Sequence, residues 1–446
     1  MIYADAVRRQ VPHMSLHSRL RIALGPWQSA PHWHVAFSGG LDSTVLLHLL
    51  ASLRDREPLP PITAVHVHHG LQPAADAWPA HCGAICESLG VPLDVLQVQV
   101  ERGASLEGKA REARYRALGS HLPVGGVLLT AQHRDDQVET VLFRLLRGAG
   151  VQGLSGMPSQ RPLAKGVLLR PLLECSRDEL EAYAHEYGLA WVEDPSNGSL
   201  VHARNYLRHR LLPVMRERWP QADASVARAA RHCAEAQLLL DDLAAVDLQA
   251  ARVPPRLDWL PIPSLDLPAL AMLAPARQRN ALRCWLRTLT RLPDHDHWAG
   301  WDALRDAACD ATPIWRLGDG ELHRGGDRLW WLSGAWLRRL GPERVDISPG
   351  VQTCLEGNGS VRLVGAGVTG SLQVRYRRGG ERMSVPGRGH RDLKRLLNEA
   401  GVPGFARARL PLLFLDDELI ALANLPQFDA RGLSLSWTPP SIPGLS

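Results

Sequence analysis

Short apolar runs alternate with longer amphipathic stretches along residues 31 to 146 of the chain. The apolar runs have the length and composition of buried strands, and the stretches between them have helix length. Examples are the runs HVAF (34–37), ITAVHV (62–67) and GVLLTA (126–131), and the stretches DSTVLLHLLASL (42–53) and DDQVETVLFRLLR (135–147). Because strands separated by helices form βαβ units, the pattern predicts an α/β fold with a doubly wound parallel sheet. Such folds bind ligands beyond the carboxyl ends of their strands.

The pattern changes twice in the rest of the chain. Residues 221 to 247 are rich in Ala, Leu and Arg and predict a long helix, and after a proline-rich connection helical periodicity resumes at PARQRNALRCWLRTL (275–289). After Gly334, short alternating runs and many glycines predict strands, and residues 341–350 make the second boundary. We therefore expect an α/β domain over 1–220, a mostly helical domain over 221–340 and a small α+β domain over 341–446.

Composition narrows the class of protein without revealing its chemistry. A chain of 446 residues has room for two or three domains, each with its own core. Charged residues make up 22% and hydrophobic residues 45% of the chain, a balance that excludes a mainly disordered protein or a coiled coil. The formal charge of +5 is by itself too small to indicate nucleic-acid binding.

The seven cysteines are odd in number and scattered, so they predict no disulfide framework. Cys82 and Cys86 have helical i, i+4 spacing, but no second pair offers the further ligands of a zinc site, and we expect both to pack in the core. The chain starts without the apolar run of a secretory signal, and no stretch approaches the roughly 18 apolar residues of a membrane span. A cytoplasmic protein is therefore expected.

A glycine-rich turn, SGGLDS, follows the first strand-length run and opens a helix-length stretch. Adjacent glycines let backbone N–H groups approach an anion closely, and a helix N-terminus and two serine hydroxyls supply further donors. This context predicts a phosphate or pyrophosphate site, although an isolated SGG is more often a plain turn in which Asp42 or Ser43 caps the helix. The expected anion-binding residues are Ser38, Gly39, Gly40, Leu41, Asp42 and Ser43.

Other nucleotide motifs are absent or lie in the wrong context. Neither GxxxxGKS nor GxxxxGKT occurs, which removes the main support for a P-loop kinase or GTPase. GAGVQG (148–153) follows a helix-length stretch, and GAGVTG (365–370) leads into a strand-length run. Neither has the strand-then-helix context of a dinucleotide site.

SGGLDS at the first strand–helix turn resembles the pyrophosphate loop of the N-type ATP pyrophosphatases, the PP-loop family. Further segments resemble the bacterial tRNA(Ile)-lysidine synthetases of that family over most of residues 34–219 and 375–425. They are VHVHHGLQ (65–72), EGKAREARY (107–115), TAQHRDDQVETVLFRLLRGAGVQGLSGM (130–157), RPLLECSRDEL (170–180), EDPSNGSLVHARNYLRHRLLP (193–213) and RRGGERMSVPGRGHRDLKRLLNEAGVPGFARARLPLL (377–413). Two positions depart from the family: Gln72 stands where it usually has Arg, and Gln132 where it usually has His.

The resemblance implies an ATP-dependent C–N ligase that converts the wobble cytidine of a tRNA(Ile) with anticodon CAU into lysidine. ATP adenylates O2 of the cytosine, and the ε-amine of free L-lysine then attacks C2 and expels AMP. The SGGLDS residues would thus bind ATP, with Mg²⁺ as cofactor, and the implied partners are the tRNA, L-lysine and a second copy in a homodimer.

Two other enzyme classes and one non-enzymatic function compete with this interpretation. Thiolation of tRNA by a related pyrophosphatase usually relies on paired reactive cysteines, and none lies near these motifs. Amidation of a small molecule would leave the basic C-terminal segment without a role. A tRNA-binding module without activity would leave an intact SGGLDS idle.

Two carboxylates, Asp136 and Glu139, lie three residues apart at the start of a predicted helix and so share one face. They could hold the ammonium groups of lysine and receive a proton from the attacking amine. Asp-x-x-Glu before an apolar run is also a capping arrangement, and both roles can hold together. Under the family resemblance we expect catalytic roles for Asp42, Asp136, Glu139 and Arg114, lysine binding by Asp136, Glu139 and His133, and a magnesium contact from Asp42.

Several other polar residues allow more than one interpretation. Arg111 and Arg114 share a helical face that could meet phosphates or could simply be solvated, and the family motif favours Arg114. His66 and His68 alternate on a strand, but without a third ligand they do not indicate zinc. The DPSN sequence from Asp194 onward could shape a loop near lysine or form an ordinary Asx turn.

Basic residues gather near the C-terminus. Between Arg375 and Arg409 there are ten Arg or Lys and three Asp or Glu, an excess that is larger than the net charge of the whole chain. Such a segment suits a track for RNA phosphates, and a merely solvated basic face is the alternative. The expected tRNA-binding residues are Arg204, Arg208, Arg377, Arg378, Arg382 and Lys394.

Overall fold

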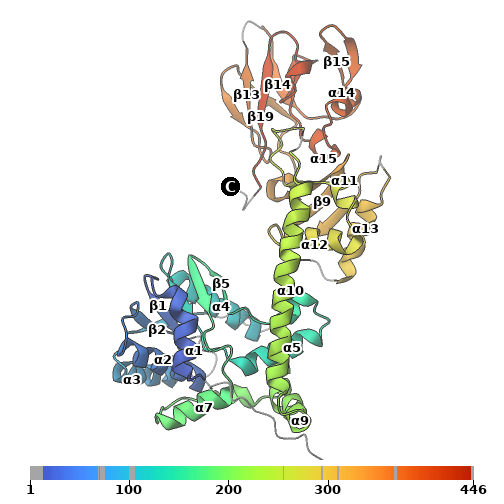
Figure 1. Cartoon of the computed structure of the whole chain (residues 1–446). Coiled ribbons are helices and arrows are strands. Elements are labelled where there is room, and N and C mark those ends of the chain that lie inside the picture. Colours follow the sequence, from blue (N-terminus) through green and yellow to red (C-terminus); the bar gives the residue numbers. More distant parts are fainter. Residues whose placement is uncertain are drawn as a thin grey trace, which may run out of the picture. The chain divides into compact units, whose positions relative to one another are not determined.

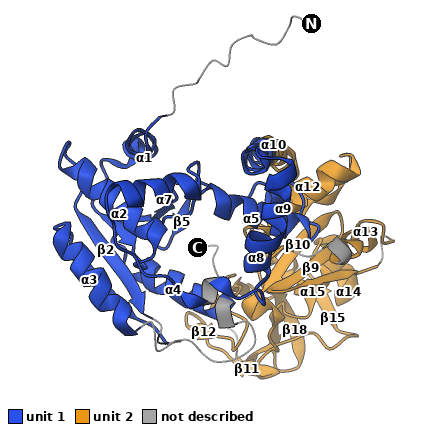
Figure 2. Ribbon diagram, turned by 90° about the horizontal axis from the view of Figure 1, so that it is seen from below, with its two compact units in different colours: residues 1–238 blue, residues 239–446 orange. Residues whose placement is uncertain are grey.

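The computed structural model describes residues 14–442 except 69, 71–75, 100–105, 255, 293–294, 309–310 and 366–368. Two compact units divide the chain, one up to Leu238 and one from Leu239 onward (Figure 2). The boundary falls inside one long helix, α10 (Ala222–Ala251), which confirms the helix expected over 221–247. We describe each unit by itself.

The first unit is built on a six-stranded sheet with the order β3-β2-β1-β4-β6-β5. Its strands are β1 (Trp33–Ala36), β2 (Ile62–His68), β3 (Leu93–Gln97), β4 (Val127–Leu129), β5 (Gln160–Leu163) and β6 (Gly166–Leu169). All neighbouring pairs are parallel except β5 and β6, which form an antiparallel hairpin. The predicted parallel α/β sheet is therefore confirmed for this unit, with one antiparallel edge strand. The strands β2 and β4 lie on opposite sides of β1. The order in which the chain adds strands to the sheet therefore reverses between β1 and β4.

Helices connect the strands (Figure 1). They are α1 (Leu16–Leu24), α2 (Leu41–Arg54), α3 (Trp78–Ser88), α4 (Leu106–His121), α5 (Arg134–Leu145), α6 (Val151–Leu154), α7 (Arg177–Glu186), α8 (Ala203–Tyr206) and α9 (Leu212–Arg218). A 3-10 turn, η3 (Pro195–Gly198), precedes α8, and a π-helical turn, η4 (Leu207–Leu211), joins α8 to α9.

The two faces of the sheet carry separate apolar clusters. Val127 and Leu129 of β4 pack in one cluster with residues of α1, α2 and α7, whereas Leu128 packs in another with Leu118 of α4. Successive side chains of a strand point to opposite faces, so a continuous apolar run is what a strand covered on both faces requires. The sheet is therefore doubly wound, as the unbroken runs predict.

The cysteines of α3 lie in the first of these clusters. Cys82 and Cys86 are almost fully buried, and burial raises the pKa of Cys82 to about 12 and that of Cys86 to about 11. These thiols stay protonated near neutral pH and act as packing residues, as predicted.

The second unit begins with helices and a sheet. Its first part contains β7 (Ser264–Asp266), α11 (Leu267–Ala271), α12 (Pro275–Leu286), α13 (Ala299–Arg305), β8 (Ile314–Leu317), β9 (Gly320–Gly325) and β10 (Arg328–Ser333). The strands form an antiparallel sheet with the order β7-β10-β9-β8. The expectation of a mostly helical segment over 221–340 overlooked this sheet. Its signals are two glycine-containing hairpin turns, at Gly318 and Gly326, between runs rich in Trp and Leu.

Small antiparallel sheets make up the remainder. They are β11 (Arg344–Asp346), β14 (Leu372–Arg375), β17 (Leu412–Leu415) and β18 (Glu418–Leu422); β12 (Gln352–Cys354), β13 (Ser360–Val364) and β19 (Ser434–Thr438); and β15 (Arg382–Val385) with β16 (Gly389–Asp392). Two short helices, α14 (Leu393–Glu399) and α15 (Gly404–Arg407), pack beside them.

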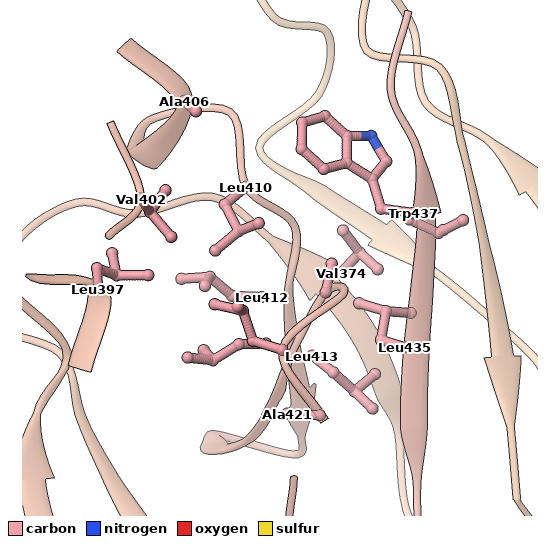
Figure 3. Packing of buried hydrophobic residues seen from close by; sticks show 14 of the residues in the cluster. Val374, Leu397, Val402, Ala406, Leu410, Leu412, Leu413, Ala421, Leu435 and Trp437 are labelled. Carbon is pink, nitrogen blue, oxygen red and sulfur yellow. The ribbon is translucent and has the colours of Figure 1, made fainter. Parts of the chain in front are cut away.

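One apolar core holds these sheets together. Val374, Leu413 and Trp437 come from three different strands and are almost fully buried in it (Figure 3). The same cluster includes Leu260 and Trp336, which precede residue 341. The domain boundary expected at 340/341 therefore lies within a stretch that shares one core, and the three-domain division stays a prediction. Within the described part of the chain, no helix is both long and apolar enough to cross a membrane.

Candidate active site

A cavity with a volume of about 950 Å³ lies at the carboxyl ends of β1, β2 and β4 in the first unit. This is the point where the strand order reverses, the usual ligand position in doubly wound folds. Residues after β1 form one wall, and residues after β4 form another. All but one of the predicted ATP-binding residues line the cavity; the exception, Gly39, lies inside the loop.

The SGGLDS loop is a compact turn. The Ser43 hydroxyl donates to the Gly40 carbonyl oxygen at 2.9 Å, and it lies 3.1 Å from the Ser38 hydroxyl. Gly40 is the N-cap of α2 and no side chain caps this helix, so the plain-turn alternative with Asp42 or Ser43 as cap is wrong. The N-terminal donors of α2 are thus left without a side-chain acceptor, an arrangement suited to an anion.

Gly39 has a backbone conformation that favours glycine. Its φ is +80°, and a Cβ atom there would lie 3.0 Å from the Sγ of Cys82. Its carbonyl oxygen also accepts a hydrogen bond from the backbone N–H of Val192 at 2.9 Å. The loop is thereby fixed against α3 and against the segment that follows α7.

The two strand histidines behave differently. The Nδ1 atom of His66 lies 2.9 Å from the carbonyl oxygen of Phe37, directly before the loop, and His66 lines the cavity. His68 instead lies 3.3 Å from the carboxylate of Asp76. Among the described residues, no three His, Cys, Asp or Glu side chains are arranged to hold a metal ion.

Asp42, in the first turn of α2, faces two cationic groups. Its carboxylate lies 3.3 Å from the guanidinium of Arg177 and 3.7 Å from Nε2 of His133. Burial nevertheless raises the pKa of Asp42 above its ordinary value, because it outweighs these two neighbours. One carboxylate beside an anion-binding loop fits a Mg²⁺ ion that takes its other ligands from phosphates and water.

His133 connects Asp42 with the carboxylates of α5. Its Nε2 lies 3.5 Å from Asp136, its Nδ1 lies 3.6 Å from Asp135, and its side chain is 1% exposed. Burial alone would lower the pKa of His133, but the three carboxylates outweigh burial and raise it. The surrounding acidic groups therefore favour the cationic form of the imidazole.

Asp136 and Glu139 lie together, as their spacing predicts. Asp136 is the third residue of α5 and accepts a hydrogen bond from the backbone N–H of the N-cap residue His133 at 3.2 Å, so the capping box pairs His133 with Asp136, and the predicted capping of Asp136 by Glu139 is wrong. Both carboxylates also contact Arg208, with Nε 2.6 Å from Glu139 and Nη2 3.3 Å from Asp136. Burial raises the pKa of Glu139, although Arg208 opposes the shift.

Comparison with known proteins identifies the family. A family model described as a PP-loop domain matches residues 12–215, a TilS substrate binding domain matches 265–330, and a TilS substrate C-terminal domain matches 372–434. The tRNA(Ile)-lysidine synthase of Pseudomonas fluorescens is 58% identical over 433 residues, which cover 96% of this chain and 98% of that one. The enzyme of the same name from Pseudomonas aeruginosa is 58% identical over 98% of this chain and its own full length, and that of Alkalilimnicola ehrlichii is 47% identical over 92% of this chain and 93% of its own.

The chain belongs to the tRNA(Ile)-lysidine synthase family. It is thus an enzyme of the PP-loop class, and the PP-loop match implies that it uses ATP. The thiolase, amidating and non-enzymatic alternatives fall away with this assignment. The remaining residues can be placed against the expectations for a lysidine synthase.

Arg114 and Arg111 separate, although they share a helix. Arg114 lines the cavity, where burial lowers the pKa of its guanidinium, whereas Arg111 does not line it and stacks on the ring of Tyr115. The family motif therefore distinguishes two arginines that helical spacing alone leaves equivalent.

Arg208 does not lie where a residue for tRNA phosphates is expected. It projects from the π-helical turn η4 into the cavity and pairs with the two carboxylates proposed for lysine. A π-turn shifts the register of the side chains along a helix, which a sequence pattern does not reveal. Arg204, one turn earlier, is partly exposed.

Several contributors were missed by sequence reasoning. Arg177 contacts Asp42 from α7, and its backbone N–H donates to Asp135 at 2.9 Å. Asp135 also accepts a hydrogen bond from Arg216 at 2.8 Å. Burial alone would raise the pKa of Asp135, but His133 and these two donors outweigh burial and hold the pKa well below its usual range. Two features of the sequence could have indicated these contacts: the adjacent acidic residues Asp135 and Asp136, and the segment SRDEL (176–180).

The structure describes Gln132, one of the two positions that depart from the family motifs, and the loop near Asp194. Gln132 lines the cavity and accepts a hydrogen bond from the Thr130 hydroxyl at 2.5 Å, whereas Gln72 lies outside the described residues. Asp194 lines the cavity, and the Asn205 side chain donates to the Ser199 carbonyl oxygen at 2.9 Å.

The other residues expected to bind tRNA lie in the second unit. Arg377 is 3.8 Å from Glu381, and Arg378 pairs with Glu343. Arg382 and Lys394 are exposed. Arg378 is exposed as well, but it is already paired with Glu343, whereas Arg377 is half-buried.

Proposed function

We propose that this enzyme ligates L-lysine to C2 of the wobble cytidine, cytidine 34, of tRNA(Ile) with anticodon CAU, through an adenylated cytidine intermediate, and releases AMP and pyrophosphate. The observation that carries the proposal is one cavity lined by both the SGGLDS loop and Asp136, which are joined through Asp42 and His133, with Glu139 buried behind the cavity wall and joined to Asp136 through Arg208. A homodimer and a cytoplasmic location stay predictions.

The loop from Ser38 to Ser43 would hold the phosphates of ATP. The uncapped N-terminus of α2 supplies backbone donors, and the Ser38 hydroxyl adds another, while the Ser43 hydroxyl donates within the loop. Asp42 is the residue that would hold Mg²⁺ together with phosphate oxygens, and the ion would supply charge compensation for the departing pyrophosphate. Arg114, which also lines the cavity, would act on the same charge.

Asp136 and Glu139 would hold the ammonium groups of lysine. The guanidinium of Arg208 contacts both carboxylates, which shows that their arrangement suits a cationic group. The ε-amine must lose a proton as its nitrogen bonds to C2 and the bond from C2 to the AMP oxygen breaks. A carboxylate with a raised pKa, such as Glu139, is suited to take that proton. His133 would fix the position of Asp136.

The tRNA would be held by basic residues outside the cavity. Arg204, Arg377, Arg378, Arg382 and Lys394 are proposed contacts, and the exposure of Arg378, Arg382 and Lys394 supports these three. For Arg208, the ion pairs favour a role inside the cavity over a phosphate contact. In the proposed division, residues 1–220 adenylate the cytidine and the parts over 221–340 and 341–446 bind the tRNA.

A single assay tests the function. Purified protein is incubated with ATP, labelled lysine and a CAU-anticodon tRNA(Ile) transcript, and label in the tRNA is measured together with AMP and pyrophosphate. We expect lysine incorporation matched by one AMP and one pyrophosphate, and none with a tRNA(Met) transcript. Release of AMP that is indifferent to lysine or to tRNA would contradict the proposal, and a gain of sulfur in the tRNA would indicate thiolation.

A further inference from the structure

A second concave surface lies beside the cavity, between α4 and the β5–β6 hairpin. We name it the α4 groove; it has a volume of about 570 Å³ and is lined by Arg111, Tyr115, Arg116, Ser120 and Arg161, among others. Gly119 allows the close approach of the two elements, since a Cβ atom there would lie 3.3 Å from that of Ala164. The groove belongs wholly to the first unit.

Guanidinium groups gather around one aromatic ring in this groove. The Cζ atoms of Arg111 and Arg161 lie 5.1 and 5.2 Å from the centroid of Tyr115. Arg170 is close enough for both to act on it electrostatically. Within the described residues, none of these three arginines forms an ion pair, whereas Arg116 pairs with Glu112 at 3.1 Å. Three neighbouring like charges without a carboxylate are stabilised by an anionic ligand.

Tyr115 connects the groove to the proposed active site. It lines both concave surfaces, and its hydroxyl accepts a hydrogen bond from the side-chain amide of Gln132 at 3.4 Å. Gln132 in turn lines the cavity directly after β4. The ring is therefore the rim between the cavity and the outer surface on this side.

A base can enter such a cavity only if its own strand continues over the rim. The phosphates on either side of an extruded nucleotide then lie at the edge of the cavity, and single-stranded RNA is bound there by guanidinium contacts and by aromatic rings. The α4 groove offers both kinds of group next to the cavity. A nucleotide bound in the cavity itself would leave Arg161 without a ligand.

We propose that the α4 groove binds the RNA strand that flanks the target cytidine, with Arg111 and Arg161 contacting a backbone phosphate and Tyr115 providing a stacking face. This inference rests on the proposed function, because that function supplies the single-stranded anticodon loop. It adds a strand-binding surface to the enzyme's ATP and lysine sites.

The test measures RNA binding by the full chain. The probe is a fluorescein-labelled hairpin of 17 nucleotides with the CAU anticodon loop, and its Kd is measured by anisotropy at several KCl concentrations. We expect Arg161→Ala and Arg111→Ala each to weaken binding about tenfold and to reduce the slope of log Kd against log salt by about one. Tyr115→Phe keeps the ring and should bind like the wild type, whereas Tyr115→Ala should bind more weakly.

Controls separate this inference from folding and from the proposed function. Arg21→Ala removes one exposed charge on α1 in the same unit and should leave the hairpin Kd unchanged. The Kd for ATP should stay within about twofold in the Arg111→Ala and Arg161→Ala variants, whose side chains do not line the cavity, and this also reports that the unit is folded. An unchanged hairpin Kd and salt slope in the Arg111→Ala/Arg161→Ala double variant would overturn the inference, as would an ATP Kd weakened in parallel. Loss of lysine incorporation by the wild type would instead overturn the proposed function.

Discussion

His133 is the residue through which the two halves of the proposed site meet. Its imidazole lies within 4 Å of Asp42, on the nucleotide side, and of Asp136, on the lysine side. The three carboxylates raise the pKa of His133 and so favour the cationic imidazole, which attracts all of them. Small changes at these side chains should therefore alter the chemistry more than the fold.

Asp136→Asn removes one proposed lysine carboxylate charge while keeping the shape of the side chain. We expect a loss of lysine incorporation on the order of 10²-fold, because a buried charge contact to the substrate is lost, with tRNA affinity nearly intact. The measurement is incorporation of labelled lysine beside tRNA binding by filter retention. Asp178→Asn, the same change at an exposed carboxylate of α7, is the matched control. Wild-type incorporation in Asp136→Asn would refute the assigned role.

Gly39→Ala tests the loop conformation. Alanine at a φ of +80° is strained, and its Cβ would press on Cys82, so we expect the KM for ATP to rise about tenfold. Gly83→Ala on α3 has open space around its Cβ and should leave the KM for ATP unchanged. A normal KM for ATP in Gly39→Ala would show that the loop tolerates another conformation.

At the scale of elements, the site depends on contacts between helices that follow different strands. Asp135 of α5 accepts from the N-terminus of α7 and from Arg216 of α9, and Arg216 also pairs with Asp223 of α10 at 2.6 Å. The opposite end of the sheet carries a separate polar cluster. There His34 of β1 is buried between the rings of His32 and His121, and His121 pairs with Asp94 at 2.9 Å.

The His34 cluster predicts acid sensitivity of the first unit. Burial first, and then the neighbouring His32 and His121, lower the pKa of His34 to about 4. Because the unfolded chain binds this proton near pH 6.5 and the folded chain only near 4, stability is lost as the pH falls between these values. From pH 7.5 to 5 the loss attributable to His34 is about 2 kcal/mol.

Urea unfolding of wild type and His34→Leu at these two pH values measures the effect. The drop in unfolding free energy between pH 7.5 and 5 should be smaller in the variant by the stated amount. His185→Leu, at an exposed position of α7, should keep the wild-type pH dependence. Equal pH dependence in all three proteins would show that His34 is not the responsible group.

At the scale of the molecule, the basic charge is unevenly distributed. Removing the excess of seven positive charges over 375–409 leaves the rest of the chain slightly acidic, although the total is +5. In the second unit some of these arginines are used internally, as Arg409 is, which is buried and donates to the carbonyl oxygen of Gly357 at 3.0 Å. The exposed members are therefore those to test for tRNA contact.

Arg382→Ala/Lys394→Ala removes two exposed charges of this segment. We expect the Kd for the complete tRNA to rise at least about tenfold and its salt slope to fall by about two, while the Kd for ATP and for the anticodon hairpin stay unchanged. Arg256→Ala/Arg279→Ala removes two exposed charges elsewhere in the same unit and is the control. Equal tRNA affinity in both double variants would show that the basic segment is a solvated surface that does not contact tRNA.

The sequence by itself determined the parallel sheet of the first unit, the position of the SGGLDS loop between a strand and a helix, and the family. Each depends on local order: apolar runs of strand length, glycines between a strand and a helix, and motifs read along the chain. The pairing of Asp136 with Glu139 was also predictable, because three residues on a helix bring two side chains to one face.

Only the tertiary structure decided which distant groups meet. Arg177 reaches Asp42, and Arg208 reaches Glu139 across 69 positions of the chain, through helix packing that local patterns do not encode. It also decided that Arg114 faces the cavity while Arg111 joins Arg161 at Tyr115, and that the segment over 264–333 contains a sheet. Contacts of this kind depend on how buried faces fit together, so they become visible only once the chain is folded.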